Sequence, residues 1–320
     1  MQNRWSVYIS TPMPDFVRED LSTAFDVTAV SDSAPTEAEL LGALRGNQVL
    51  LCGVKPKLTA NVIEHLPDSV KAIATYSVGH EHIDLDAARA RGLTVFNTPD
   101  VLTPAVAENA FFLMLGAGRR ATESIALIRS RQWTGWTPRQ LNGHEVYNKT
   151  IGIFGMGRIG RAIASRARAF DMTIHYSNRS RLAPDLEQGA IFHANPDDML
   201  PNIDVLMLAA PSTPETQGFL NAARIKLLPS SAVVVNIGRG NLVVDDALIG
   251  ALSRQDIFAA GLDVFNNEPN LDARYYDLPN VFMLPHIGSS TVETRRAMGI
   301  ALRDGLLAWR NGERPFNQLV

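Results

Sequence analysis

The feature that most constrains the fold is a glycine-rich segment, TIGIFGMGRIGRAIASRARAF, at residues 150–170. An apolar, β-rich run leads directly into Gly155, Gly157 and Gly160, and a helical pattern continues from Arg158. In the spacing GxGxxG between a strand and a helix, the glycines permit a tight turn, the approach of a pyrophosphate to the backbone, and close packing of the helix on the strand. The segment therefore predicts a parallel α/β unit that binds a dinucleotide at a helix N-terminus; a glycine turn without a ligand is the alternative.

The alternation of β-rich runs and helical patterns extends through most of the 320 residues, a length that suits two domains with separate cores. We expect strands at residues 7–9, 49–52, 72–76, 94–96, 150–154, 173–177, 205–209, 232–237, 259–264 and 281–284. We expect helices at residues 36–44, 158–169 and 291–309, and a long one after Pro104 that reads as an interdomain helix. This alternation predicts parallel sheets built from βαβ units.

Composition excludes several classes of function. A formal net charge of -3, from 30 basic and 33 acidic residues, gives no basic field to attract nucleic acid or a membrane surface, so we expect a small ligand. Cys52 is the single cysteine, and His80 and His82 do not have the spacing of metal ligands, so we predict no disulfide and no metal. The sequence shows neither a signal-peptide pattern nor an apolar run of bilayer length, and we expect a cytoplasmic protein.

The end of the second strand after the glycines bears on the type of dinucleotide. NAD-binding folds place Asp or Glu there, about 20 residues beyond the glycines, for the ribose 2′-hydroxyl. Here the strand ends in Asn178, Arg179, Ser180 and Arg181, without an acidic residue. Either arginine can pair with a 2′-phosphate, and Asn178 and Ser180 can donate hydrogen bonds to it. The segment therefore favours NADP(H) as the cofactor, and NAD(H) is the weaker alternative. If the segment binds no ligand, its arginines belong to a solvent-exposed turn.

Three polar residues follow later strand runs: Arg239 in NIGRG, Glu268 in GLDVFNNEP and His286 in LPHIGS. Doubly wound folds place their chemistry at the carboxyl ends of strands. Taken singly, each residue has a structural explanation: a surface charge, a turn carboxylate before Pro269, and a loop histidine. Together they supply a cation for a substrate carboxylate, a carboxylate that orients a proton donor, and a donor that titrates near neutrality. Reduction of a 2-ketoacid requires this set.

The blocks GMGRIG, NIGRG, GLDVFNNEP and LPHIGS, in this order and spacing, resemble the signature blocks of the D-isomer-specific 2-hydroxyacid dehydrogenases over nearly the whole chain. Within that family, SVGHEHID, NTPDVLTPAVAEN and SNRSR are most similar to segments of the NADPH-type glyoxylate/hydroxypyruvate reductases. The resemblance implies an α/β fold of two doubly wound parallel-sheet domains. A flavodoxin-like substrate domain would comprise residues 1–98 and 287–320, and a Rossmann dinucleotide-binding domain residues 99–286. The implied activity is reduction of glyoxylate to glycolate and of hydroxypyruvate to D-glycerate with NADPH.

The resemblance also implies catalytic and substrate-binding roles for individual residues. His286 would be the proton donor, Glu268 its partner, and Arg239 the arginine that binds the substrate. The backbone amides of Val78 and Gly79 would bind the substrate carboxylate, and His286 would contact the substrate as well.

The implied cofactor site extends beyond the three glycines. Asp263 would contact the nicotinamide carboxamide, and Pro211 and Ser212 would form part of the wall beside the cofactor. The full set implied for the cofactor is Gly155, Gly157, Arg158, Ile159, Gly160, Asn178, Arg179, Ser180, Arg181, Pro211, Ser212, Ile237, Asp263 and Gly288.

Residues 133–149 lack periodicity and predict a loop or arm. In similar reductases this arm reaches across a dimer, so the resemblance implies a homodimer. Trp136 resembles a tryptophan that lines the pocket of the other subunit; packing of Trp133 and Trp136 for stability alone is the alternative. His80, beside the amide donors, either tunes the polarity of the substrate site or is a structural or solvent-facing histidine.

Alternatives for the function come from two classes. Within the family, the chain could act on bulkier 2-ketoacids or be of the phosphoglycerate type. Outside catalysis, a dinucleotide-sensing corepressor shares this fold, and fold alone does not distinguish binding from catalysis. The complete set of Arg239, Glu268 and His286 argues for an enzyme.

Overall fold

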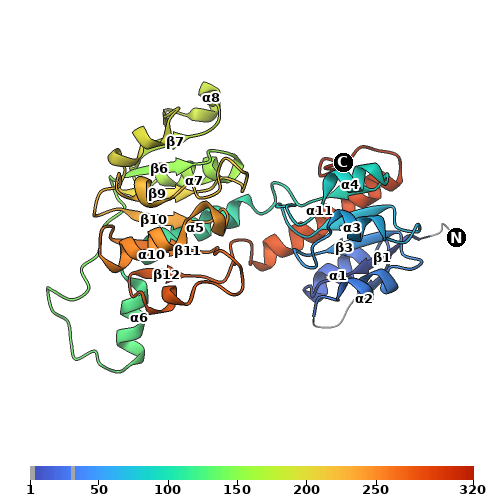
Figure 1. Ribbon diagram of the computed structural model, residues 1–320, viewed down its shortest axis with the longest axis horizontal. Helices are drawn as coiled ribbons and strands as arrows, with labels where there is room; N and C mark the ends of the chain where they lie inside the picture. The colour runs from blue at the N-terminus through green and yellow to red at the C-terminus, as the bar shows by residue number, and fades with distance from the viewer. Residues whose placement is uncertain (1–3, 30–32) are drawn as a thin grey trace. The chain divides into compact units, whose positions relative to one another are not determined.

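The computed structural model describes residues 4–29 and 33–320, which form two compact units. The first unit contains the residues up to Leu102 together with Ser289–Val320, and the second contains Thr103–Gly288. Each unit is built on one parallel sheet with helices packed against it (Figure 1). The predicted class, two doubly wound parallel-sheet domains, is confirmed. The sequence placed the domain boundaries at residues 98 and 286, and those of the units lie at 102 and 288.

The first unit has a five-stranded sheet with the order β2-β1-β3-β4-β5, which is that of flavodoxin-like folds. Its strands are β1 (Ser6–Ile9), β2 (Asp26–Ala29), β3 (Val49–Cys52), β4 (Ala72–Thr75) and β5 (Thr94–Phe96). Its helices are α1 (Asp15–Ser22), α2 (Glu37–Ala43), α3 (Ala60–Glu64), α4 (Leu85–Ala90) and α11 (Val292–Arg310). Every residue of β3 and β4 is buried, because helices cover both faces of a parallel sheet.

Short-range signals and close packing position the helices of this unit. Helix α2 begins with a capping box, in which Glu39 Oε2 accepts a 2.8 Å hydrogen bond from Thr36 N while Thr36 Oγ1 accepts from Glu39 N. Helix α11 packs on α1, where a Cβ at Gly299 would lie 2.8 Å from Val17 Cγ1, so a small residue is needed at this crossing. The C-terminal residues then bond to β5 through Leu319 N and other amides.

The second unit has a seven-stranded parallel sheet with the order β12-β11-β10-β9-β6-β7-β8, the Rossmann order with one further strand. Its strands are β6 (Thr150–Phe154), β7 (Thr173–Ser177), β8 (Ile191–Phe192), β9 (Val205–Leu208), β10 (Val233–Asn236), β11 (Ala259–Leu262) and β12 (Val281–Met283). Its helices are α5 (Thr103–Gly118), α6 (Ala121–Arg129), α7 (Arg158–Arg168), α8 (Pro184–Glu187), α9 (Ala222–Ile225) and α10 (Asp245–Ser253). Four 3-10 turns complete it: η1 (Pro196–Asp198), η2 (Leu200–Asn202), η3 (Gly240–Leu242) and η4 (Ala273–Asp277).

Helix α5 is buried over most of its surface and packs on strands β10 and β11. A Cβ at Gly261 in β11 would lie 2.7 Å from the backbone oxygen of Leu113, so glycine allows the helix to approach the sheet closely. Arg120, at a φ of 56°, separates α5 from α6. Residues 130–149 then form no helix or strand, and Figure 1 shows this segment (green) running away from the sheet before it returns to β6.

Each strand run predicted from the sequence contains a strand, but β2 and β8 were not predicted. Strand β8 has only two residues, and the sequence of β2, DVTA, alternates polar and apolar residues instead of forming an apolar run. The helix expected after Pro104 is two helices, α5 and α6, and both belong to the second unit. Within residues 4–29 and 33–320, no helix is both long and apolar enough to cross a membrane.

Candidate active site

The glycine turn between β6 and α7 has the geometry that a pyrophosphate needs. Gly155 has a φ of 99°, and a Cβ there would lie 2.5 Å from Ala210 N. A Cβ at Gly160 would lie 2.4 Å from the oxygen of Gly155, so helix and strand approach too closely for a side chain. At Gly157, by contrast, a Cβ would meet no atom within 4 Å.

Helix α7 begins at this open position. Gly157 is the N-cap residue and provides no side-chain hydrogen bond to the first turn, which contains Arg158 and Ile159. The first amides of a helix have no partner within the helix and carry partial positive charge. The open space at Gly157, the N-terminus of α7 and the glycine cradle fit the pyrophosphate of a dinucleotide.

The chain after β7, which we expect to distinguish NADP from NAD, contains Asn178, Arg179 and Ser180. Asn178 Oδ1 accepts a 2.6 Å hydrogen bond from Met156 N, which ties this strand end to the glycine turn and leaves its amide nitrogen as a donor. Arg179 and Ser180 are exposed. Arg179 is close enough to Glu215 to contribute to the lowered pKa of that carboxyl, although hydrogen bonds from Thr213 and the backbone contribute more.

Arg181 does not present a free guanidinium. Its Nε and Nη2 donate to Oε1 and Oε2 of Glu187 at 3.0 and 2.9 Å. Glu187 is 8% exposed and also accepts from the hydroxyl of Tyr176 at 2.8 Å, and these bonds hold the pKa of its carboxyl below the ordinary value. The contacts of Arg181 therefore assign it to the fold of this loop, which differs from the phosphate contact expected from the sequence.

Arg239, Glu268 and His286 follow β10, β11 and β12, which are neighbours in the sheet. Parallel strands end at one edge, so the sheet brings the loops that carry the three residues together. His286 Nδ1 and Glu268 Oε2 are 2.7 Å apart, and Glu268 Oε1 accepts a 2.8 Å bond from Phe265 N. Both oxygens of the carboxylate are thus fixed, one by the backbone and one by the imidazole.

Electrostatics keep Glu268 ionised. Burial raises the pKa of its carboxyl, but the bonds from His286 and Phe265 and the positive charges of His286 and Arg239 lower it more, so that the net shift is downward. A carboxylate in this state can orient the imidazole and stabilise its charged form.

The loop of Arg239 lies directly against the loop of Glu268. A Cβ at Gly240 would be 1.9 Å from the carbonyl carbon of Phe265 and 2.3 Å from Asn266 N. These are backbone atoms that cannot rotate away, so only glycine allows this approach. Gly240 therefore sets the distance between Arg239 and the carboxylate loop, a role that the sequence motif NIGRG does not disclose.

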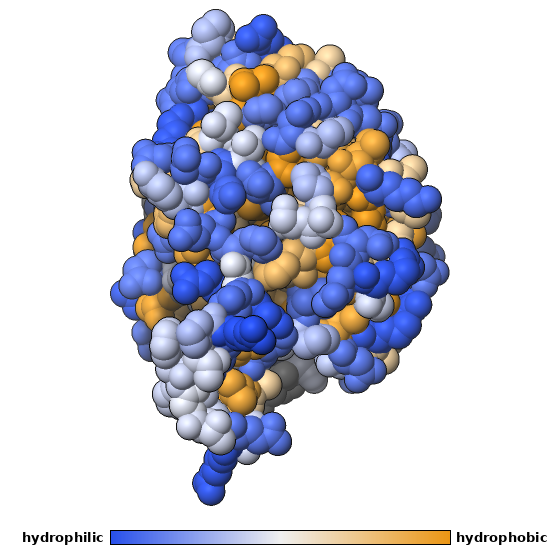
Figure 2. Space-filling model, turned by 90° about the vertical axis from the view of Figure 1, so that its left-hand side faces the viewer, coloured by the Kyte–Doolittle hydropathy of each residue, from blue (hydrophilic) through white to orange (hydrophobic). Residues whose placement is uncertain are grey.

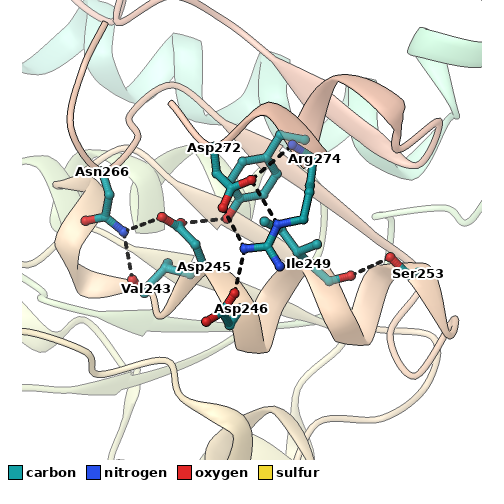
Figure 3. Close-up of polar contacts among 9 residues, drawn as sticks. Val243, Asp245, Asp246, Ile249, Ser253, Asn266, Asp272 and Arg274 are labelled. Carbon is teal, nitrogen blue, oxygen red and sulfur yellow. Dashed lines mark hydrogen bonds and ion pairs between the residues drawn. The ribbon is translucent and has the colours of Figure 1, made fainter. Parts of the chain in front are cut away.

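A polar network behind these loops holds them in place (Figure 3). Asn266 donates to Val243 O at 3.1 Å and to Asp245 Oδ2 at 2.9 Å, so it links the Glu268 loop to the start of α10. Arg274 bridges Asp246 and Asp272, and its guanidinium lowers the pKa of Asp272 to about 2. Asn266 therefore connects the Glu268 loop to the chain after Arg239 by its side chain as well as by the backbone contact at Gly240.

Asp263 fixes the turn that follows His286. It is 2% exposed, and its two oxygens accept from Ile287 N at 2.8 Å and Gly288 N at 2.9 Å. Burial raises the pKa of this carboxyl, and the two hydrogen bonds offset part of the rise. His286 itself has a φ of 55°, in the left-handed region that a clamped backbone can hold. The structure thus gives Asp263 a backbone-positioning function; the expected carboxamide contact remains a prediction.

The expected wall residues also come together. Ser212 Oγ accepts a 2.7 Å bond from Asn241 Nδ2, which joins the loop after β9 to η3. Pro211 O accepts from Thr216 Oγ1 at 2.7 Å, and Ile237 is buried at the end of β10. Asn241 was not predicted from the sequence, where its position after GRG carries no signal of a contact with Ser212.

Val78 and Gly79 lie in the first unit, in the loop that follows β4. Asn97 Nδ2 donates to Val78 O at 3.0 Å, and Ser77 Oγ donates to Gly79 O at 2.6 Å, so both carbonyls are held. None of the hydrogen bonds described for residues 4–29 and 33–320 uses the amides of these two residues. Free neighbouring amides on a pinned loop are suited to bind a carboxylate.

A metal site is not apparent in the described part of the chain. No group of three or more His, Cys, Asp or Glu side chains among these residues has the arrangement of metal ligands. Cys52 is buried, and burial raises the pKa of its thiol to about 12.

Comparison with known proteins places the whole chain among related sequences. Residues 111–288 match the family model for the D-isomer specific 2-hydroxyacid dehydrogenase, NAD binding domain. The chain is 42% identical over 301 residues to glycerate dehydrogenase of Hyphomicrobium methylovorum, covering 93% of this chain and 94% of that protein. It is 39% identical over 319 residues to glyoxylate reductase of Thermococcus kodakarensis, covering 98% and 95%.

Solved structures agree with this placement. A putative D-isomer specific 2-hydroxyacid dehydrogenase from Polaromonas sp. JS6 66 superposes with a TM-score of 0.95 at 46% identity, over 99% of this chain and 100% of that one. An NADPH-dependent glyoxylate/hydroxypyruvate reductase from Sinorhizobium meliloti, in complex with NADP and malonate, gives a TM-score of 0.88 at 32% identity, over 99% and 97%.

Proposed function

Because the chain belongs to the D-isomer specific 2-hydroxyacid dehydrogenase family, we propose that it reduces small 2-ketoacids, glyoxylate and hydroxypyruvate above all, with NADPH. The observation that carries the proposal is the 2.7 Å contact between His286 Nδ1 and Glu268 Oε2, with Arg239 at the end of the adjoining strand. A bound reduced nicotinamide would supply the hydride for C2 of the ketoacid. Relatives named glyoxylate reductase and glyoxylate/hydroxypyruvate reductase support the choice of substrates.

His286 is the proton donor in this proposal. Its contact with Glu268 uses Nδ1–H as the donor, which leaves Nε2 to carry the proton that reaches the substrate oxygen. The depressed pKa of Glu268 keeps the carboxylate charged, so that it both orients the ring and stabilises the imidazolium. Arg239 binds the substrate carboxylate, and its charge also stabilises the negative oxygen that forms during hydride transfer. In the first unit, the amides of Val78 and Gly79 are the proposed donors to the carboxylate of a 2-ketoacid.

The preference for NADP(H) rests on Arg179, Asn178 and Ser180. The strand end has no acidic residue to repel a 2′-phosphate, and Asn178 keeps a free amide nitrogen while its oxygen is held by Met156 N. Arg179 is exposed, whereas Arg181 is paired with Glu187. We therefore assign the ion pair with the 2′-phosphate to Arg179 alone.

We also propose a homodimer formed through the second unit. Several large apolar side chains of α5, α6 and the following arm are about half exposed or more: Phe112 (54%), Ile125 (49%), Ile128 (58%), Trp133 (52%) and Trp136 (78%). Figure 2 shows apolar areas between hydrophilic ones on one face of the molecule. Exposed aromatic and aliphatic groups in this number favour an interface. Trp136 would then enter the partner, and sedimentation of wild type and Trp136→Ala tests the arrangement.

Steady-state oxidation of NADPH and NADH with glyoxylate, hydroxypyruvate, pyruvate and a bulkier 2-ketoacid tests the proposal. We expect the highest kcat/KM with NADPH and the two small acids. Arg239→Gln and His286→Asn should each lose activity by about 10²-fold or more. Arg254→Gln, which changes an exposed arginine that forms an ion pair with Asp256, is the matched control. Cofactor binding without turnover of any 2-ketoacid would refute the proposal.

A further inference from the structure

The loop after β4, which carries Val78, Gly79 and His80, and the chain segment after β5 each contain a polar atom without a partner in the described protein. Nδ1 of His80 and Oγ1 of Thr98 are buried and have no hydrogen-bond partner in the described structure. Thr98 is completely buried, and His80 is partly buried. Buried polar atoms are nearly always paired in folded proteins, and exceptions are expected where a ligand binds. The two atoms therefore indicate unused hydrogen-bonding capacity in the loop after β4 and in the segment after β5, which Thr98 N joins to that loop through Ser77 O.

The backbone that carries these residues is firmly held. Thr98 N donates to Ser77 O at 3.0 Å, which joins the ends of β4 and β5. Ile83 N donates to His80 O at 2.9 Å, which closes the turn on the other side. The adjacent His82 uses its ring for a 3.0 Å bond with Thr75 and thus has a structural role. In the segment SVGHEHID, His80 has a buried ring nitrogen for which the described residues provide no hydrogen-bond partner.

A neighbouring loop adds positive charge at the same edge of the sheet. The loops after β3 and β4 run side by side, because Tyr76 N donates to Cys52 O at 2.8 Å and Leu58 N donates to His82 O at 2.7 Å. Between these two contacts lies Lys55, which is exposed and for which the described residues provide no ion pair. These two neighbouring loops thus carry an ammonium group, an imidazole and two backbone amides, groups that suit an anionic molecule with a hydroxyl group.

We propose that His80 is a specificity-determining residue, which hydrogen-bonds the C3 hydroxyl of hydroxypyruvate and so selects 2-ketoacids with a polar C3 substituent over glyoxylate. The inference rests on the proposed function, since it takes the amides of Val78 and Gly79 as the site of the C1 carboxylate. The C3 hydroxyl is three bonds from C1, within the reach of the next side chain along the loop. A neutral imidazole both donates and accepts, so it can pair with a hydroxyl. Glyoxylate has only a hydrogen at this place.

The test compares kcat/KM for hydroxypyruvate and glyoxylate in wild type, His80→Leu and His80→Gln. Loss of one hydrogen bond to the hydroxyl corresponds to a change of about tenfold. We expect the ratio of hydroxypyruvate to glyoxylate to fall about tenfold in His80→Leu and to recover largely in His80→Gln, whose amide also donates and accepts. The loss should appear mainly with hydroxypyruvate.

His65→Leu is the matched control, because His65 is an exposed histidine of the same unit at the end of α3 and should leave the ratio unchanged. An unchanged ratio in His80→Leu, or an equal loss with both acids, overturns the inference while the reductase function stands. If His80→Leu does not fold, the test rests on His80→Gln. A tenfold fall in its ratio of kcat/KM for hydroxypyruvate to kcat/KM for glyoxylate then overturns the inference. Wild-type protein that reduces neither acid contradicts the proposed function itself.

Discussion

Replacement of Gly240 by alanine should inactivate the enzyme without removing any group that contacts substrate or cofactor. The added Cβ would lie 1.9 Å from the carbonyl carbon of Phe265 and 2.1 Å from its oxygen. Carbon atoms in contact lie about 3.5–4.0 Å apart, so the two backbones must separate by roughly 1.5 Å. Arg239 then moves away from Glu268 and His286 by a comparable distance.

A displacement of about 1 Å in a catalytic constellation costs about 10²-fold in rate, and we expect a loss of this size in kcat/KM for glyoxylate. Overpacking of this kind also destabilises by about 1–3 kcal/mol, which should lower the Tm by several degrees. Steady-state kinetics together with calorimetry measure both quantities. The Kd for NADPH should change less than the rate, because the glycine turn at Gly155 lies on a different strand.

Gly42→Ala is the matched control. Gly42 lies within α2, and a Cβ there would meet no atom within 4 Å, so the substitution should leave activity unchanged and stability equal or higher. If Gly240→Ala has wild-type kcat/KM and Tm, the distance between the Arg239 and Glu268 loops is not critical, and the reasoning from this contact is wrong.

Three further predictions concern the cofactor and the proton donor. Gly157→Ala should fold normally, because its Cβ meets no atom of the protein within 4 Å. The added methyl group should block the pyrophosphate and raise the Kd for NADPH at least tenfold. An unchanged Kd in a fluorescence titration would exclude this turn as the phosphate site. Glu268→Gln removes the carboxylate that the depressed pKa of Glu268 keeps ionised, so His286 loses its charged partner. The alkaline limb of the pH profile of kcat/KM should therefore move to lower pH. Profiles of variant and wild type that overlay would contradict the pairing of Glu268 with His286. Arg179→Ala should raise the KM for NADPH about tenfold without affecting the KM for NADH. Arg181→Ala should mainly lower the Tm, because Arg181 is paired with Glu187. A raised KM for NADPH in Arg181→Ala but not in Arg179→Ala would assign the phosphate contact to Arg181.

The sequence predicted the buried parts of the fold well because parallel strands covered on both faces are continuous apolar runs. Segments VLLC, AIAT and VVVN are of this kind, and each is a strand buried at every position. Strands at the margins of the sheets lack the signal: β2 alternates polar and apolar residues, and β8 is two residues long. Their pairing depends on neighbouring strands, which a local pattern does not reveal.

The sequence singled out candidate residues for the site but did not reveal their contacts. Arg239, Glu268 and His286 stood out because each follows a strand run, yet their proximity depends on β10, β11 and β12 being neighbours in the sheet. The engagement of Arg181 with Glu187 and Tyr176 could not be read from the strand end, because the carboxylate arrives from α8 and a tyrosine of β7 completes the group. An arginine near a phosphate motif is therefore an ambiguous signal until its competing partners are known.

Contacts to the backbone connect the three loops that carry Arg239, Glu268 and His286. Gly240 joins the loop after β10 to the loop after β11, and Asp263, at the end of β11, accepts the two amides that follow His286 after β12. A shift of the carboxyl end of β11, which lies between β10 and β12, should therefore displace both Arg239 and His286 relative to Glu268. Residues that touch neither substrate nor cofactor should consequently affect the rate as strongly as those that do, and the tolerance of the site to substitution should be lowest along β11.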